Sequence, residues 1–532
     1  MKKGVIWMQD VLFYGGDIVT MAGGGPERET PQAVLVRGGN IAHVGTLREA
    51  REKAAPGAQE VDLKGRCLIP AFIDSHSHIV NFANSLRFVN LTQARSFAEI
   101  QKMLLDYKTR MNTAPGVWVI GFSYDHNFLK EHAHPNRKVL DAALPDNPVL
   151  ISHASGHMGV ANTQALKALG LGPETPNPPG GVIGREEDGC TPNGYLEEKA
   201  FMAAGGRIPG ASRAEMERLM VRAQEIYLSY GITTAQEGIA KEQEMDVLEA
   251  AKLKMDVVAY IDMKECPELL HRNAEYFGTY QNGLKIGGYK IFLDGSPQGR
   301  TAWMTKPYSV GEAGYTGYPI YDDAQVKAFV RGAHAAHAQL LCHCNGDAAA
   351  EQFIRAHEEP TDCRDVMIHA QLVREDQLLR MKEKGILPSF FVAHTYYWGD
   401  THVENFGMER AARISPAKSA LEAGLPFTLH MDTPVLPPDM VDVLYCAMNR
   451  VTRSGVTLGA DQRLDAWEAM LGLTRNAAYQ YFEEDTKGTI EAGKRADLVV
   501  LSENPLKTPR EQMRRIQVLS TYKDGACVFS RN

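Results

Sequence analysis

The chain has 532 residues, of which 44% are hydrophobic and 23% are charged, which is enough for a large core and more than one domain. Its formal net charge is -8, and acidic and basic residues are mixed along it, so charge gives no indication of a nucleic-acid or membrane partner. The absence of any run of about 18 apolar residues argues against a membrane span.

The opening segment, "MKKGVIWMQDVLFYGGD", reaches Asp10 before a long apolar run forms, so we do not expect a secretory signal peptide. The eight cysteines have irregular spacings and form no C-x-x-C pair, which predicts reduced thiols and a cytoplasmic protein. Cys342 and Cys344 flank His343, and we interpret them as small buried strand residues rather than metal ligands.

The two ends of the chain have similar patterns. "DVLFYGGDIVTM" and "AVLVRGGNIAHVG" near the start, and "GTIEAGKRADLVVLS" near the end, are apolar or β-branched runs broken by glycine turns. They predict a small composite β-sandwich domain formed by residues 1–68 and 485–532. Such a domain requires the residues between them to fold as a closed unit with adjacent ends.

Residues 69–484 alternate between helical stretches, such as "SRAEMERLMVRAQEIYLSYG", and short apolar strands, such as "LLCHCNGD". This alternation predicts an α/β domain with a parallel sheet, and its length fits a (β/α)₈ TIM barrel with a long insertion at about 95–210. The insertion contains the proline- and glycine-rich "LGPETPNPPGGVIGREEDG", which we expect to be a loop.

Polar side chains recur at the C-terminal ends of the predicted barrel strands, where the active site of such a fold lies. They are His76, His78, Lys290, Asp294, His343, Asp347, His369, His394, His430 and Asp432. His76 and His78 are alternate residues of one strand and face the same side, so both can bind one metal ion. Further ligands come from other strands: His343, His369 and Asp432. A single strand-end histidine is more often a hydrogen-bonded core residue, which is our interpretation of His153, His334, His337 and His430.

Lys290 lies inside the apolar strand "GGYKIFLDGS". Desolvation lowers the pKa of a buried lysine, and the neutral amine can add CO₂ to form a carbamate that bridges two metal ions. The alternative is a strand lysine paired with Asp294.

The motifs "DSHSHI", "YKIFLDGSPQGRTA", "CHCNGDAAAE", "IHAQLV" and "LHMDTPV" occur in an order that resembles the amidohydrolase superfamily. The resemblance is closer to the branch with the N-substituted formamide deformylases and the YtcJ-like hydrolases, and it extends from about residue 10 to residue 530. It implies a (β/α)₈ barrel with a composite β-sandwich. It also implies that His76 and His78 bind one metal, with Asp432 close to it as general base.

By the same resemblance, carboxylated Lys290 would bridge to a second metal held by His343 and His369. His157, in "SGHMGVAN", would lie near the substrate, and Arg300 is a further substrate-binding candidate. Two positions depart from the branch, which usually has glutamate where Ile368 stands and Gly-Ser where His430-Met431 stands. Neither change removes a ligand, but both can alter the hydrogen bonds that orient the ligands and tune metal affinity.

These residues predict hydrolysis of a C–N amide-type bond in a small molecule, such as an amide, an N-formyl group or a cyclic amide. The cofactor would be one or two divalent metal ions, with zinc expected and iron or manganese as alternatives. His394, in the aromatic segment "FFVAHTYYWGD", is a candidate substrate contact. A homodimer is a reasonable expectation, and no nucleotide-binding loop occurs.

Two other functions stay open. A deaminase on a similar barrel typically has a glutamate three residues after the third histidine, where this chain has Gly346, followed by Asp347. The second is a non-catalytic, metal-bound binding protein, which would have no chemical need for Asp432.

Overall fold

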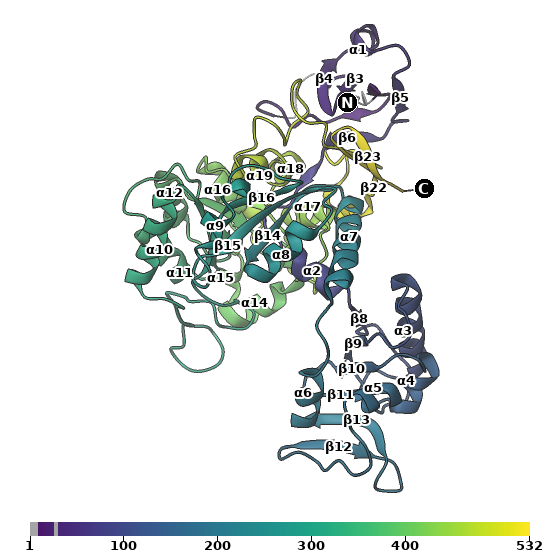
Figure 1. The fold of residues 1–532 in the computed structure, drawn as a ribbon. Helices are drawn as coiled ribbons and strands as arrows, with labels where there is room; N and C mark the ends of the chain where they lie inside the picture. The colour runs from purple at the N-terminus through teal and green to yellow at the C-terminus, as the bar shows by residue number, and fades with distance from the viewer. Residues whose placement is uncertain (1–8, 26–29, 532) are drawn as a thin grey trace. The chain divides into compact units, whose positions relative to one another are not determined.

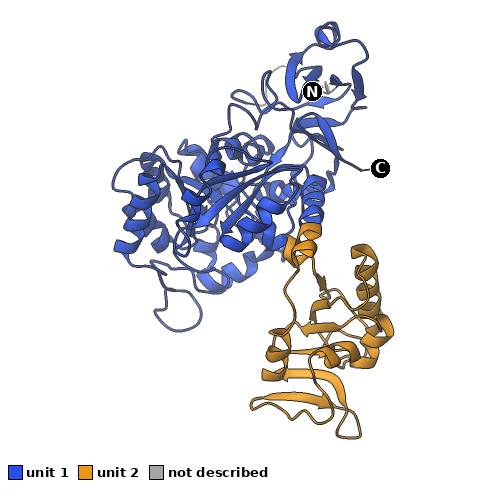
Figure 2. Cartoon of the chain, in the orientation of Figure 1, with its two compact units in different colours: residues 1–82, 220–532 blue, residues 83–219 orange. Residues whose placement is uncertain are grey.

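The computed structural model describes residues 9–25 and 30–531. The chain forms two compact units (Figures 1 and 2), one of residues 1–82 and 220–532 and the other of residues 83–219. Residues 1–8, which include much of the segment compared above with a signal peptide, lie outside the described residues. No helix in the described part of the chain is long and apolar enough to cross a membrane.

The larger unit contains an eight-stranded parallel sheet with the order β20-β19-β18-β17-β16-β15-β14-β7. Its strands are β7 (Phe72–Ile73), β14 (Ile232–Ala240), β15 (Asp256–Asp262), β16 (Leu284–Phe292), β17 (Gln339–Cys344), β18 (Val366–His369), β19 (Leu387–Phe390) and β20 (Thr428–Leu429). Every residue of β15 is buried, as expected for a parallel strand covered on both faces. The sheet confirms the predicted α/β class.

The two edge strands of this sheet, β7 and β20, are followed by segments that contact each other. Ser75 Oγ donates to the carbonyl oxygen of Leu429 at 3.0 Å, and the backbone N–H of His78 donates to Thr433 at 2.8 Å. These bonds bring the first and last strands of the sheet together at their carboxyl ends.

Amphipathic helices connect the strands, and their sequences specify their ends. Helix α10 (Asp323–Ala335) begins after Asp322, whose carboxylate accepts from the backbone N–H of Gln325 at 2.8 Å. Val326, Val330 and Ala333 form its buried stripe. Helix α12 (Glu375–Lys384) ends at Gly385, which has a left-handed φ of 76°.

A five-stranded sheet, β2-β6-β21-β22-β23, draws on both ends of the chain. Its strands are β2 (Asp17–Ile18), β6 (Cys67–Pro70), β21 (Leu498–Leu501), β22 (Val518–Lys523) and β23 (Ala526–Ser530). A second sheet, β4-β3-β1-β5, contains β1 (Val11–Tyr14), β3 (Ala33–Arg37), β4 (Asn40–Gly45) and β5 (Gln59–Asp62). Both sheets contribute to one hydrophobic cluster, in which the rings of Phe13 and Tyr522 are 4.9 Å apart.

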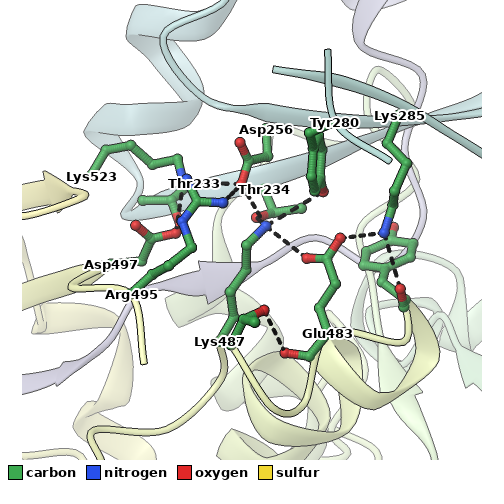
Figure 3. A network of polar contacts seen from close by, with 12 residues as sticks. Thr233, Thr234, Asp256, Tyr280, Lys285, Glu483, Lys487, Arg495, Asp497 and Lys523 are labelled. Carbon is green, nitrogen blue, oxygen red and sulfur yellow. Dashed lines mark hydrogen bonds and ion pairs between the residues drawn. The ribbon is translucent and has the colours of Figure 1, made fainter. Parts of the chain in front are cut away.

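A buried network of charges joins the N-terminal ends of β14, β15 and β16 to the C-terminal segment (Figure 3). Asp256 accepts from Arg495 at 2.8 Å and from Lys523 at 3.0 Å, and it also pairs with Lys487. Burial alone would raise the pKa of Asp256, but Lys487, Lys523 and Arg495 lower it far below its usual range. The network anchors the C-terminal segment to the parallel sheet.

The smaller unit has a six-stranded sheet with the order β12-β13-β11-β10-β9-β8. Its strands are β8 (Phe88–Asn90), β9 (Val119–Tyr124), β10 (Val149–His153), β11 (Met158–Ala161), β12 (Gly181–Arg185) and β13 (Pro192–Glu198). Its helices are α3 (Phe97–Met111), α4 (Arg137–Ala143), α5 (Thr163–Ala168) and α6 (Lys199–Gly205).

Strand β12 lies within the proline- and glycine-rich stretch that the sequence predicts to be a loop, and that prediction is wrong for these residues. Strand β12 pairs antiparallel with β13. A Cβ atom on Gly181 would lie 2.5 Å from the backbone nitrogen of Ala200. The glycine therefore permits a close approach of two backbone segments rather than only a turn.

Candidate metal centre

Four of the predicted ligands gather at the carboxyl ends of β7, β18 and β20. His76 and His78 follow β7, His369 is the last residue of β18, and Asp432 follows β20. The Nε2 atoms of His76 and His78 each lie 3.5 Å from Asp432 Oδ1. His369 Nε2 lies 4.0 Å from Asp432 Oδ2. Asp432 is thus the common neighbour of three histidines.

The remaining two predicted ligands join the same cluster. His343, in β17, has its Nδ1 atom 3.1 Å from His369 Nε2. Lys290, in β16, has its Nζ atom 3.5 Å from His76 Nε2. The fold therefore brings all six residues together, although they come from five separate strand ends.

The donor set fits a divalent transition-metal ion. A four-coordinate zinc ion with ligands at 2.0–2.1 Å has about 3.3 Å between neighbouring ligand atoms, close to the separations above. Asp432 Oδ1 is buried without a hydrogen-bond partner among the described residues, as an atom awaiting a cation would be. His369 and Asp432 also have left-handed φ angles of 71° and 54°, which are uncommon for non-glycine residues and cluster at functional sites.

Lys290 is almost fully buried, with 1% of its surface exposed. Burial lowers its pKa to about 8, against the opposing effect of Asp432. Among the described residues, the polar contact of Lys290 Nζ is with His76 Nε2, at 3.5 Å, rather than with a carboxylate. Asp294, its alternative partner, accepts instead from three backbone N–H groups, those of Trp303, Asn345 and Gly346.

The charges of the cluster compensate one another. Burial opposes protonation of His78, but Asp432 and Glu237 raise its pKa to about 9. Burial would raise the pKa of Asp432, but its contact with His78 lowers it below the usual value. Burial also lowers the pKa of His343 to about 4, so this ring is neutral and has a lone pair to offer.

Two residues of β14 hold the histidines of the first strand, and the sequence analysis missed both. Gln236 Oε1 lies 2.6 Å from His76 Nδ1, and Glu237 Oε1 lies 3.5 Å from His78 Nδ1. Glu237 also accepts from the backbone N–H of Val80 at 2.8 Å. The strand that begins "ITTAQEG" contains this Gln-Glu pair within an otherwise mostly apolar, buried pattern, which is the sequence signal that could have indicated it.

His430 is a buried, hydrogen-bonded residue, as the sequence suggested, but it also contacts a predicted ligand. Its Nε2 atom lies 3.1 Å from His369 Nδ1, and its Nδ1 atom lies 2.8 Å from Ser389 Oγ. The departure from the usual Gly-Ser at this position therefore replaces small residues with an imidazole that orients His369.

A sequence model described as the amidohydrolase family matches residues 59–529. The chain belongs to this family. The match confirms the resemblance that the ordered motifs indicated.

Two curated relatives align over nearly the whole chain. The chain is 29% identical to the N-substituted formamide deformylase of Arthrobacter pascens, and the alignment covers 98% of this chain and 99% of that protein. It is 27% identical to the putative amidohydrolase YtcJ of Bacillus subtilis (strain 168), with 98% and 99% covered. Among solved structures, an uncharacterized metal-dependent hydrolase from Pyrococcus furiosus is 26% identical, with a TM-score of 0.73 over 94% of this chain and 100% of that chain.

The three predicted substrate contacts of this amidohydrolase-family chain differ in their placement. His394 is buried and begins the short helix α13 (His394–Tyr397), beyond the end of β19, so it is not the strand-end residue that the sequence suggested. Its ring is 4.7 Å from that of Phe391, which is 5.3 Å from that of His430. The ring of Phe391 therefore lies between His394 and His430, which contacts the predicted ligand His369.

The other two contacts lie in exposed positions. Arg300 is exposed in the segment after β16 and has a left-handed φ of 57°. No contact joins it to the six predicted ligands within the described residues. His157 belongs to the unit of residues 83–219, where its Nδ1 atom lies 3.2 Å from Glu198 Oε2.

Proposed function

We propose that this chain is a metal-dependent hydrolase that cleaves a C–N amide-type bond of a small molecule, such as an amide, an N-formyl group or a cyclic amide. The observation that carries the proposal is the Asp432 carboxylate, whose unpartnered Oδ1 atom lies within 3.5 Å of two histidine nitrogens. The relatedness to an N-substituted formamide deformylase supports the choice of bond.

The site would hold one or two divalent ions, and we propose zinc. His76, His78 and Asp432 would bind one ion, and His343 and His369 a second, with a carbamate on Lys290 between them. The isolation of Lys290 from any carboxylate partner in the described residues supports the carbamate. When bound, such an ion supplies Lewis acidity, which acidifies water and polarises a carbonyl group.

Asp432 is the proposed general base. Its Oδ1 atom would accept a proton from the attacking water as the water oxygen bonds to the carbonyl carbon. The same carboxyl group would then donate that proton to the leaving nitrogen as the C–N bond breaks. The products are a carboxylate and an amine. From a cyclic amide, both groups would be on one ring-opened molecule. His430 and Gln236 would position the histidines throughout.

Substitution of Asp432 tests this role. We expect Asp432→Asn to abolish the release of amine from N-substituted formamides and simple amides while metal content stays near that of the wild type. The exposed Asp461, which pairs with Arg413, provides the control Asp461→Asn, which should retain full turnover. Activity that survives in Asp432→Asn would show that another group is the base.

Elemental analysis of protein produced with added zinc tests the carbamate. We expect two ions per chain at this centre in the wild type and one or fewer at this centre in Lys290→Ala. One ion at this centre in both proteins would mean that Lys290 has a structural role only.

The surroundings of Asp347 weigh against the deaminase alternative. Asp347 Oδ1 accepts from the backbone N–H of Thr305 at 2.8 Å, and Arg374 donates to its other oxygen at 3.1 Å. This carboxylate is therefore engaged, and Gly346 before it offers no acid. Release of free ammonia rather than a substituted amine would favour the deaminase, and no turnover of any C–N substrate would favour a binding protein.

We further propose that the parallel sheet closes as a (β/α)₈ barrel within residues 69–484, with the insertion at about 95–210. The bonds between the segments after β7 and β20 support closure. The two terminal sheets would form the composite β-sandwich of residues 1–68 and 485–532, as their shared cluster suggests. The free cysteines are compatible with the cytoplasmic location we propose, and a homodimer remains a prediction.

A further inference from the structure

A second group of potential metal ligands lies in the unit of residues 83–219. Strands β9 and β10 are parallel neighbours, and Tyr124 at the end of β9 pairs with His153 at the end of β10. Asp125 and His126 directly follow β9, so their side chains begin at the same edge of the sheet as His153. One carboxylate and two imidazoles thus lie together at the carboxyl ends of two parallel strands. The predicted ligands of the larger unit also lie at the carboxyl ends of parallel strands.

The three side chains approach one another through single ligand atoms. His126 Nδ1 lies 3.2 Å from His153 Nε2. Asp125 Oδ1 lies 3.5 Å from His153 Nε2 and 3.9 Å from His126 Nδ1. A tetrahedral zinc ion with ligands at 2.0–2.1 Å separates them by about 3.3 Å, so these atoms approximate one face of its coordination shell.

We propose that Asp125, His126 and His153, all in the unit of residues 83–219, form a binding site for Zn²⁺ or a similar divalent transition-metal ion that uses none of the ligands of the proposed hydrolytic centre. Two imidazole nitrogens and one carboxylate oxygen are suitable ligands for such ions. The side chains of Asp125 and His126 are 26% and 30% exposed, so a hydrated ion can reach them, while His153 is 9% exposed and held in place.

The surroundings of His153 set the strength of this site. Ser155 Oγ lies 2.9 Å from His153 Nδ1 and can accept its proton, which leaves the Nε2 lone pair free for a metal. The backbone N–H of Ser155, 3.1 Å from the same nitrogen, favours the opposite tautomer. Because binding must overcome this second contact, we expect weaker affinity here than at the proposed hydrolytic centre.

The loop after β9 is held next to the site by a third histidine, His134. The ring of His134 stacks on that of His126 at 4.0 Å, and Tyr124 Oη lies 3.0 Å from His134 Nδ1. A bound ion would therefore fix the loop between β9 and α4 to the end of β10. A bound ion would thus add to the hydrogen bond between His126 and His153 and to the backbone bond from Ala154 to Tyr124, which already join these segments.

Zinc binding by the full chain tests the proposal. The proteins compared are the wild type, a variant with His126→Gln and His153→Gln, and a His132→Gln control. His132 is exposed in the same loop and makes no side-chain hydrogen bond with the described residues. Each protein is stripped with a chelator, reloaded with zinc, passed through a desalting column and analysed for zinc per chain. The series is repeated with His76→Ala and His78→Ala, to separate this site from the hydrolytic centre.

We expect the pair variant to hold one zinc fewer per chain than the wild type in both backgrounds, with the control unchanged. Equal zinc in the pair variant and the wild type would overturn the proposal, and so would an equal loss in His132→Gln. If the pair variant does not elute as a folded species, His126→Gln alone replaces it, and at least a tenfold weaker Kd for zinc is expected. The readout is independent of turnover, so a failure of the proposed hydrolase activity would leave this result intact.

Discussion

Gly238 lies against both histidines that follow β7. A Cβ atom at this position would be 2.7 Å from His76 Cε1 and 2.9 Å from His78 Cε1. Real side chains do not tolerate such distances, so even an alanine would move one or both rings away from Asp432. The absence of a side chain at this one position is thus part of what holds the predicted ligands together.

We expect Gly238→Ala to weaken metal binding at the proposed hydrolytic centre by at least tenfold, because it displaces two ligands at once. Titration of the chelator-treated protein with zinc, followed by competition with a coloured chelator, measures the effect. Gly172→Ala is the matched control, since a Cβ atom there would meet nothing within 4 Å. Unchanged affinity in Gly238→Ala would show that the rings can shift without loss of coordination.

Gln236 supports a second residue-scale prediction. Its Oε1 atom faces His76 Nδ1, and the loss of such an outer partner typically lowers metal affinity by about 10- to 100-fold. We expect Gln236→Leu to show a loss of this size in zinc affinity. Gln352→Leu also removes a buried amide, but one that donates to the carbonyl oxygen of Tyr321 and to Asp323 rather than to a predicted ligand, so it should lose stability without losing zinc.

The six predicted ligands were readable from the sequence because each interrupts an apolar strand pattern at its carboxyl end. The roles of Gln236 and His430 were not, for a physical reason. Each acts on a ligand from a different strand, and His430 meets a histidine 61 positions away along the chain. The order of apolar and polar residues along one strand does not predict which side chain of another strand will contact a given residue.

At the scale of elements, the charge network around Asp256 makes a prediction about acid stability. The pKa of this carboxyl group is lowered on folding, so its contribution to stability is complete above the unfolded value of about 3.9 and is lost as the pH falls below it. We expect Asp256→Asn to lower the free energy of unfolding by about 1.5–3 kcal/mol near pH 7, because Lys487, Lys523 and Arg495 each lose one of their carboxylate partners.

The difference between Asp256→Asn and the wild type should shrink as the pH falls below about 4, because the Asp256 carboxylate of the unfolded chain then binds a proton that the folded chain does not. Urea unfolding at a series of pH values measures this convergence. Asp362→Asn, at an exposed position, serves as control and should follow the wild type at every pH. A difference that is constant with pH would contradict the assigned role of the charge.

Helices and strands could be predicted where the spacing of apolar residues along the chain distinguishes one from the other. The alternation of helices and apolar strands predicted the parallel sheet, and helix α7 (Arg213–Ser229) lies within the amphipathic stretch from which it was expected. Strand β12 was not predictable, because proline and glycine around it indicate turns. Its pairing with β13 is a tertiary contact that local propensity does not contain.

At the scale of the whole molecule, residues of the C-terminal segment make hydrogen bonds to the backbone beside the candidate metal centre. Tyr481 Oη donates to the carbonyl oxygen of Asp74 at 2.8 Å and accepts from Gln236 Nε2 at 2.9 Å. Gln480 Nε2 donates to the carbonyl oxygen of Ser75 at 2.9 Å. Residues far beyond Asp432 thus fix the backbone that presents His76.

We expect Tyr481→Phe to lower the free energy of unfolding by about 1–3 kcal/mol, because the buried carbonyl oxygen of Asp74 loses its hydroxyl donor and Gln236 Nε2 keeps only its bond to Ser75. Zinc affinity at the hydrolytic centre should fall with it, since the backbone before His76 loses an anchor. Urea unfolding of the metal-free protein and zinc titration measure the two effects separately. Tyr479→Phe is the control, and no change in either measurement for Tyr481→Phe would refute the support role.

The five-stranded sheet has a consequence for synthesis. Asn504 donates to Asp17 of β2 at 2.8 Å, and 487 residues separate them. Ribosomes add about 5–20 residues per second, so the first strands wait about 25 to 100 seconds for their partners to emerge. During that interval the edge of β6 is open to other chains, and a nascent-chain chaperone that covers it would raise the yield of folded protein.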